Sequence, residues 1–353
     1  MRRSFLTLIV ALVICAGMNL FLAEFIEEYV IQIINMVGVS IILAVSLNVI
    51  NGLTGQFSLG HAGFMAIGAY VAAFFTTDLS YFNPETAEYT SDPAMVTSVW
   101  GYLGALLAGG VAAALAGLVV GIPTLRLKGD YLAIATLGFG EIVRILITNF
   151  EKVGGANGLS GIPQFQVVLS GEGTDAFALD STFFIFAFVV LCVLLSAQLQ
   201  RSTYGRALIA VRENELAAEV MGIPASRLKI MAFVYGAFFA GIAGGLFAHL
   251  LQTITPASFT FMKSVEVVVM LVLGGLGSMT GAIVGAIVLT VLPEALRDVE
   301  KEAELPGIRM VVYALILILL MIFRPQGIFG QKELSLKLVR RVLPNRRDEG
   351  GRK

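Results

Sequence analysis

The segment IMAFVYGAFFAGIAGGLFAHLL, residues 230–251, decides the fold class, because it contains no Asp, Glu, Lys or Arg. A helix needs about 20 apolar residues to cross the hydrocarbon core of a bilayer, and this segment has that length. The segment therefore predicts a transmembrane helix.

Comparable apolar runs occur along most of the chain and predict about ten transmembrane helices. They lie near residues 5–23, 29–50, 59–77, 99–122, 131–149, 181–200, 230–251, 264–276, 279–293 and 307–323. The two runs within 264–293 are short, and they are compatible with one long helix or with a re-entrant hairpin buried in protein. We keep them as two spans, because merging them would put the basic C-terminal tail on the wrong side of the membrane.

The composition agrees with this interpretation, because 57% of the residues are hydrophobic and only 14% are charged. Ordinary soluble domains have roughly 25% charged residues. The predicted fold class is therefore all-α, a polytopic membrane protein. Cys15 and Cys192 lie inside apolar runs and are expected to be small buried residues rather than a disulfide.

Basic residues test the order of the spans. If the N-terminus is cytoplasmic, 18 of the 24 Lys and Arg residues fall in cytoplasmic segments and four fall on the opposite side. This bias satisfies the positive-inside rule and predicts that both termini are cytoplasmic. The run after Met1-Arg2-Arg3 is interpreted as an uncleaved first helix, because no small-x-small cleavage site follows it.

Glycines recur at four-residue spacing within the predicted spans. The positions are Gly117 and Gly121, then Gly241 and Gly245, then Gly277, Gly281 and Gly285. Such spacing lets two helix backbones approach closely, so we interpret it as a packing feature. An alternative is that glycine leaves room for a moving gate.

Polar residues interrupt the apolar pattern where the third span begins, in residues 51–64. Gln56, Ser58 and His61 are poor choices for a lipid-facing surface, and the glycines around them permit irregular backbone. Irregular backbone at membrane depth is buried in protein or lines a cavity, so these three are candidates for a translocation path. A lone histidine is more often a satisfied structural residue.

Two ionisable residues, Glu141 and Arg144, lie inside the fifth span. Three residues apart on a helix they share a face and are expected to pair. A charge at the bilayer centre costs roughly 2.5–3.5 kcal/mol, so they are also candidates for the path. Glu266 is a further intramembrane acid with no obvious local partner.

The longest cytoplasmic connection, residues 201–229, contains one or two short amphipathic helices between 205 and 223, ended by Gly222-Ile223-Pro224. Its predicted apolar face consists of Ala207, Leu208, Val211, Leu216, Ala218 and Met221. Such a helix lies on the membrane surface or fits a groove on a partner.

These motifs together resemble the branched-chain amino-acid ABC permeases of the LivM type, from about residue 38 to 330. The resemblance is carried by residues 52–64, 127–131, 136–138, 154–158, 205–222, 274–278 and 323–330. The order Glu215-x-Ala217-Ala218, with Gly222 after it, resembles the EAA-type loop by which importer permeases dock on ATPases. The residues expected to couple the chain to an ATPase are Arg212, Glu213, Asn214, Glu215, Ala217, Ala218 and Gly222.

We expect a permease domain over residues 1–330, and the excess of Lys and Arg over residues 331–353 predicts a basic cytoplasmic tail that meets anionic lipid. The resemblance implies a multi-pass subunit of the bacterial inner membrane that contains half of the path for branched-chain amino acids. The implied partners are a second, LivH-like permease, two cytoplasmic ATP-binding subunits and a periplasmic amino-acid-binding protein. Acidic outer loops, such as residues 294–304, suit a docking rim for that last partner or are simply solvated.

The sequence contains no phosphate-cradling loop, nucleophile elbow or Cys/His metal spacing. The chain is therefore not expected to be an enzyme, to hold a cofactor or metal, or to bind nucleic acid. Urea or short-amide ABC permeases are similar enough to remain an alternative. An ion-coupled secondary carrier is a more remote alternative, motivated by Glu141, Arg144 and Glu266.

Overall fold

The computed structural model describes residues 27–77, 99–124, 129–164, 166–170, 177–297, 308–324 and 327–330, together with residues 17, 82–83, 88–89 and 300. This part of the chain is mostly helical. The predicted first span, apart from residue 17, and the predicted tail 331–353 lie outside the described residues.

Each predicted span from 29–50 onward coincides with a helix. The helices are α2 (Glu28–Leu47), which continues as the π-helix η1 (Asn48–Leu53), α3 (His61–Thr76), α5 (Val99–Thr124), α6 (Asp130–Thr148), α7 (Ser181–Arg201), α8 (Thr203–Glu213), α9 (Glu215–Val220), α10 (Ala225–Leu251), α11 (Phe261–Gly274), α12 (Met279–Ala295) and α14 (Ile308–Phe323), with short 3-10 turns at Glu151–Val153, Gly155–Asn157 and Pro256–Phe259. Within the described residues, five helical segments are long and apolar enough to cross a membrane: Glu28–Leu53, Val99–Pro123, Asp130–Thr148, Ser181–Arg201 and Ala225–Leu251. The chain is therefore a multi-pass membrane protein.

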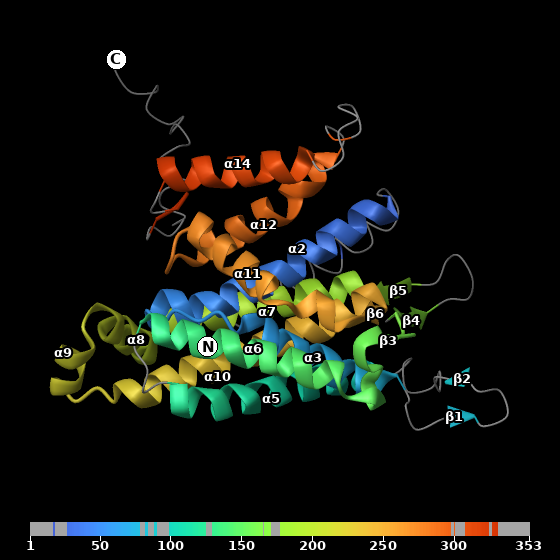
Figure 1. The fold of residues 1–353 in the computed structure, drawn as a ribbon, viewed down its shortest axis with the longest axis horizontal. Helices are drawn as coiled ribbons and strands as arrows, with labels where there is room; N and C mark the ends of the chain where they lie inside the picture. Colours follow the sequence, from blue (N-terminus) through green and yellow to red (C-terminus); the bar gives the residue numbers. More distant parts are fainter. Residues whose placement is uncertain are drawn as a thin grey trace, which may run out of the picture.

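Three short antiparallel strand pairs, which the sequence analysis did not predict, accompany the helices. They are β1 (Phe82–Asn83) with β2 (Glu88–Tyr89), β3 (Leu159–Ser160) with β6 (Thr253–Ile254), and β4 (Gln166–Ser170) with β5 (Phe177–Asp180). All of them lie at one end of the bundle, whereas α8 and α9 lie at the other (Figure 1). The two ends therefore differ in structure.

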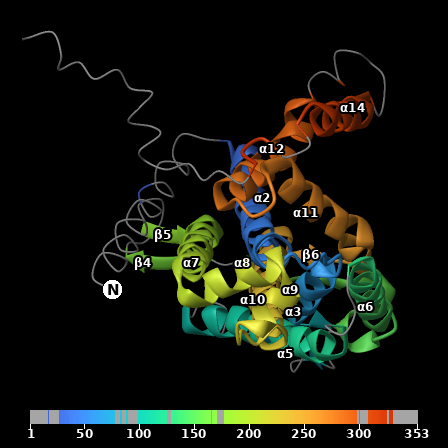
Figure 2. The same cartoon turned by 90° about the vertical axis from the view of Figure 1, so that its left-hand side faces the viewer.

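Helix α10 forms the centre of the bundle and packs against α2, α3 and α5 (Figure 2). Three glycines permit this packing, because backbone meets backbone where α3, α5 and α10 come together. A Cβ atom on Gly68 would lie 2.1 Å from the carbonyl oxygen of Gly241, and one on Gly109 would lie 2.6 Å from the carbonyl oxygen of Gly68. We call Gly68, Gly109 and Gly241 the glycine contact. It confirms the packing interpretation for Gly241.

Helices α11 and α12 form an antiparallel hairpin rather than one long helix. A Cβ on Gly274 would lie 2.0 Å from the oxygen of Gly281, and one on Gly285 would lie 2.0 Å from the oxygen of Met270. The turn between them contains Gly277 with φ +86°, a left-handed conformation that favours glycine. The region 264–293 thus contains two helices and not one long helix, as predicted, whereas their description as two full spans remains a prediction.

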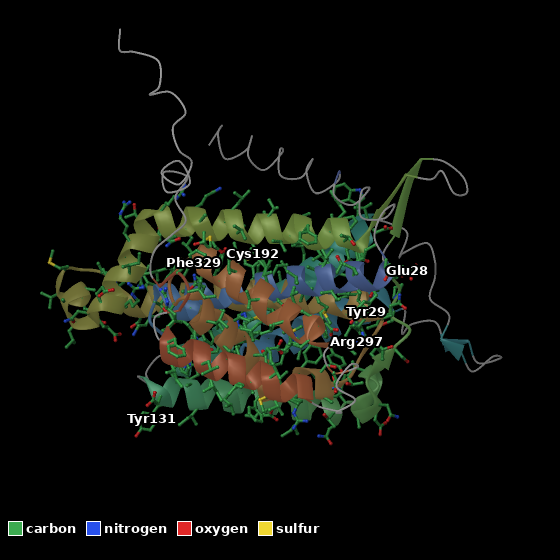
Figure 3. All side chains as sticks on the ribbon, turned by 90° about the horizontal axis from the view of Figure 1, so that it is seen from above. Glu28, Tyr29, Tyr131, Cys192, Arg297 and Phe329 are labelled. Atoms are coloured by element: carbon green, nitrogen blue, oxygen red, sulfur yellow. The ribbon has the colours of Figure 1, made fainter. Side chains whose placement is uncertain are left out.

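Residues 327–330, which we call the C-terminal strap, return to this hairpin after α14. The backbone N–H groups of Ile328 and Phe329 donate to the carbonyl oxygens of Leu273 and Gly274 at 2.8 and 3.1 Å. Phe329 thus lies away from the end that holds Tyr29 and Arg297 (Figure 3). The strap fixes the end of α14 beside the α11–α12 turn.

Large apolar side chains cover the outer faces of three helices. They include Leu107, Val111, Leu115 and Val119 on α5, Ile134, Ile142, Ile145 and Leu146 on α6, and Val311, Leu315, Ile318 and Ile322 on α14. A soluble monomer rarely exposes apolar patches of this extent. These faces are suited to contact with lipid or with another membrane subunit.

Candidate functional site

The connection between α7 and α10, which we call the coupling segment (residues 201–229), contains two capped helices. The Ser202 hydroxyl accepts a hydrogen bond from the Gly205 N–H at 3.1 Å and begins α8. The Asn214 side chain accepts one from the Ala217 N–H at 3.0 Å and begins α9. Each helix is thus defined by its own polar cap.

The end of α9 follows from Gly222, as the sequence predicted. Gly222 has φ +81°, its N–H donates to Glu219, and the N–H of Ile223 donates to Ala218 at 3.0 Å. This pair of bonds is a Schellman motif, which requires a left-handed residue after the helix. The chain then turns into α10 at Ala225.

The predicted apolar face of the coupling segment is only partly correct. Leu208, Val211 and Ala218 are buried in a small core, and that core also contains Val49 and Leu53 of η1. Leu216 and Met221 were predicted on the same face, but they are 69% and 81% exposed. Asn214 has extended backbone angles, so α9 starts on a new axis and does not continue the face of α8.

The exposed residues of α9 make an apolar surface of their own. Val220 is 88% exposed, and it lies one turn after Leu216 and next to Met221. We call Leu216, Val220 and Met221 the α9 apolar surface. Two ion pairs lie near the ends of these helices: Glu215 at the start of α9 pairs with Lys229 of α10 at 2.6 Å, and Arg212 pairs with its neighbour Glu213 at the end of α8 at 2.7 Å.

The predicted path residues Gln56, Ser58 and His61 lie in the interior. Their exposed fractions are 5%, 0% and 1%. The His61 Nε2 lies 2.9 Å from the Ser46 hydroxyl of α2. The N–H of Ser58 donates to the side-chain oxygen of Asn51 at 3.2 Å. In this conformation they hold the α2–α3 connection against the bundle.

Two further polar residues that the sequence analysis missed also anchor this connection. The Thr136 hydroxyl of α6 accepts from the Leu59 N–H at 3.0 Å, and the Ser264 hydroxyl of α11 accepts from the Ala62 N–H at 2.9 Å. Thr136 and Ser264 each interrupt an apolar run of the sequence, and a hydroxyl residue in such a run is the pattern that could have identified them. The connection thereby contacts α2, α6 and α11.

A groove of about 220 Å³ joins two groups of residues that the sequence analysis treated separately. Its lining residues are Thr54, Gly55, Gln56, Phe57, Gly129, Leu132, Val211, Arg212, Glu213, Asn214, Glu215 and Lys229. Gln56 from the α2–α3 connection therefore lies beside Arg212 and Glu215 of the coupling segment. Ser58 and His61 do not line it.

The predicted pair on α6 is confirmed. The Nε of Arg144 donates to Glu141 at 2.7 Å, and the two side chains are about one-third and one-quarter exposed. The other carboxylate oxygen of Glu141 accepts from the backbone N–H of Phe261 at 3.2 Å, at the start of α11. Glu266 was predicted to have no local partner, but Lys263 pairs with it at 3.0 Å, one turn earlier on α11.

Among the described residues, no group of three or more His, Cys, Asp or Glu side chains is arranged to hold a metal ion. The described site consists of ion pairs, capped helices and an exposed apolar surface.

Comparison with known proteins shows to which family this chain is related. A family model described as the permease component of branched-chain amino acid transport systems matches residues 29–322. The chain is 38% identical over 329 residues to the high-affinity branched-chain amino acid transport permease LivM of Escherichia coli K12, covering 87% of this chain and 72% of that protein. No solved structure matches it.

Two more distant relatives extend the comparison. The probable permease LivM of Methanocaldococcus jannaschii is 26% identical over 338 residues, covering 86% of this chain and 95% of that protein. The permease LivH of Escherichia coli K12 is 25% identical over 300 residues, covering 83% and 92%. With a family model that spans most of its length and a relative above 30% identity, this chain belongs to the family of branched-chain amino acid transport permeases.

Proposed function

We propose that this chain is the permease subunit of an ATP-driven importer of branched-chain amino acids, and that α9 docks on a cytoplasmic ATPase. The α9 apolar surface is the observation that carries the proposal. Three large apolar side chains exposed on an otherwise charged segment mark a contact site for another protein. An ATPase subunit is the occupant that the family of the chain implies.

The proposal includes a topology of about ten spans with both termini in the cytoplasm of a bacterium, in the inner membrane. Residues 1–330 form the permease domain and residues 331–353 form a basic tail. The charge bias of the sequence supports this orientation.

ATP hydrolysis then takes place on two separate cytoplasmic subunits. The permease LivH among the relatives supports a second, LivH-like permease as the partner within the membrane. A periplasmic amino-acid-binding protein would meet the end opposite α9, where Tyr29 donates to Glu294 and Arg297 lies over the Tyr29 ring (Figure 3).

Three groups of residues have distinct roles in this proposal. Arg212, Glu213, Asn214, Glu215, Ala217, Ala218 and Gly222 shape the coupling segment, through the pairs and caps described above. Glu141 and Arg144 present charge on the outer face of α6, where the second permease would complete the path. Gln56, Ser58 and His61 hold the α2–α3 connection beside that path.

Substituting Val220→Asp is expected to reduce leucine uptake at least about tenfold in vesicles that contain both permeases, the ATPases and the binding protein. An interface hot spot of about 1.4 kcal/mol gives that factor. Since Val220 is 88% exposed, the fold of the permease should not change. The measurements are ATP-dependent uptake and co-purification of the ATPases.

The matched control is Val220→Ile, which keeps the apolar surface and should keep both uptake and assembly. Normal assembly of the Val220→Asp complex would contradict docking through α9. Uptake of urea or a short amide in place of leucine would favour the alternative substrates. Uptake that needs no ATPase and follows an ion gradient would instead indicate a secondary carrier.

The topology makes a separate prediction. In a chain without Cys15 and Cys192, a cysteine at Val220 should react with a membrane-impermeant maleimide only when the reagent reaches the cytoplasmic face. A cysteine at Lys152, in the loop after α6, should react from the opposite side. Reaction of both positions from one side would refute the predicted number of spans between them.

A further inference from the structure

We infer that Arg212 is a positioning residue that transmits movement of the coupling segment to two places at once, the α2–α3 connection and the α11–α12 turn. The inference rests on the proposed function, because it assumes that an ATPase moves the coupling segment. It assigns a specific mechanical role to one side chain of that segment.

The first argument is where Arg212 lies. It is the penultimate residue of α8 and precedes Asn214, the cap of α9, so it marks the corner between the two helices. Its side chain is only 22% exposed and leaves the coupling segment to reach the bundle. A shift or rotation of that corner therefore displaces its guanidinium group.

The contacts of the guanidinium group are directional. Its Nη1 donates to the carbonyl oxygen of Gly52, at the end of η1, at 2.9 Å. Its Nε and Nη2 donate to the carboxylate of Glu213 at 3.1 and 2.7 Å, which fixes the plane of the group. A cation that meets an orphan carbonyl at a helix end makes a strong, charge-assisted bond.

Three glycines make room for this side chain. A Cβ on Gly55 would lie 2.8 Å from the Cγ of Arg212, and one on Gly277 would lie 3.0 Å from its Nη1. Gly52 also has no room for a side chain, since a Cβ there would lie 2.7 Å from the backbone N of Gly277. The α2–α3 connection and the α11–α12 turn thus meet at the tip of Arg212.

A second bond joins these two segments directly. The side-chain oxygen of Asn48, in the first residue of η1, accepts from the N–H of Gly277 at 3.0 Å. The C-terminal strap holds the other side of the same turn through Leu273 and Gly274. Movement imposed on Gly52 is therefore shared with α11, α12 and the end of α14.

The apolar contacts of α8 do not supply this coupling. Leu208 and Val211 pack against Val49 and Leu53, and such contacts hold α8 in place without fixing the distance to one backbone atom. An arginine that bonds a single carbonyl does fix that distance. The π-helical form of η1 is consistent with this role, because π-helical turns often occur at functional sites.

The test substitutes Arg212→Gln in the complete complex, with the binding protein and leucine present. The expected result is a complex that assembles and hydrolyses ATP, but that hydrolyses about tenfold more ATP per leucine imported. Loss of one charge-assisted bond is enough for that factor. Arg212→Lys should recover only part of the coupling, because lysine lacks the planar fork.

The matched control is Arg206→Gln on the same helix. Among the described residues, Arg206 bonds to the Arg201 carbonyl and the Thr203 hydroxyl of its own neighbourhood, so the ATP-to-leucine ratio should not change. A purely structural role for Arg212 would lower ATP hydrolysis and uptake together and would leave their ratio unchanged. That outcome would overturn the inference.

Asn48→Ala provides a second variant if Arg212→Gln does not assemble. It removes the hydrogen bond between η1 and the α11–α12 turn without altering the coupling segment, and it should raise the same ratio. A normal ratio in Asn48→Ala would also overturn the inference. Failure of the proposed function is distinguishable, because then the unsubstituted complex would show no ATP-dependent leucine uptake at all.

Discussion

Substituting Gly68→Ala is expected to reduce the yield of folded protein at least about tenfold. The new methyl carbon would lie 2.1–2.4 Å from three backbone atoms of Gly241, and backbone cannot change rotamer to make room. Extra methyl groups in well-packed interiors cost about 1–3 kcal/mol, and a wedge between two backbones falls at the upper end of that range. The measurement is the monodisperse fraction on size exclusion after detergent extraction, with a thermal challenge.

Gly104→Ala on α5 is the matched control. No atom of the described residues lies within 4 Å of the Cβ that it would add, and alanine favours a helix by up to about 1 kcal/mol over glycine. Its yield should equal or exceed that of the unsubstituted chain. Equal yields for Gly68→Ala and Gly104→Ala would show that α3 and α10 are not in backbone contact.

Substituting Glu141→Leu is expected to lower both folded yield and uptake. The change leaves Arg144 without its partner and removes the acceptor for the Phe261 N–H at the start of α11. An arginine at the bilayer centre costs about 2.5–3.5 kcal/mol on insertion scales, and Arg144 should cost less than that, because it lies four residues from the end of α6 and can reach the interface. Yield and uptake are measured in the same membranes.

The double variant Glu141→Leu/Arg144→Leu separates the two effects. Because it also removes the unpaired charge, it should recover most of the folded yield, whereas uptake should stay low if these charges serve the path. Ile142→Leu, which alters an exposed apolar residue on the same helix, should have no effect. A double variant less stable than Glu141→Leu would mean that Arg144 has a partner other than Glu141.

Local patterns were sufficient to predict the helices. An apolar run predicts a membrane helix without knowledge of its neighbours, and α10 contains the whole apolar run 230–251. The pair Glu141–Arg144 and the end of α9 at Gly222 were also predictable, since each depends on residues at most five positions apart.

Contacts between distant residues were not predictable in this way. The bond from Gly277 to Asn48 joins residues 229 positions apart, and the bond from Ala62 to Ser264 joins residues 202 positions apart. The exposure of Leu216 was wrongly predicted, because helical periodicity assumes one axis and Asn214 begins another. The pairing of β3 with β6 likewise depends on how the ends of α6 and α10 meet in space.

The glycine contact has a consequence for how this protein can change shape. Side chains that interdigitate can often repack in a second arrangement, but Gly68, Gly109 and Gly241 meet through backbone atoms and have no rotamers to exchange. Helices α3, α5 and α10 should therefore behave as one solid body during a transport cycle. Any displacement of α2, α6 or the α11–α12 hairpin would then be a movement relative to these three helices.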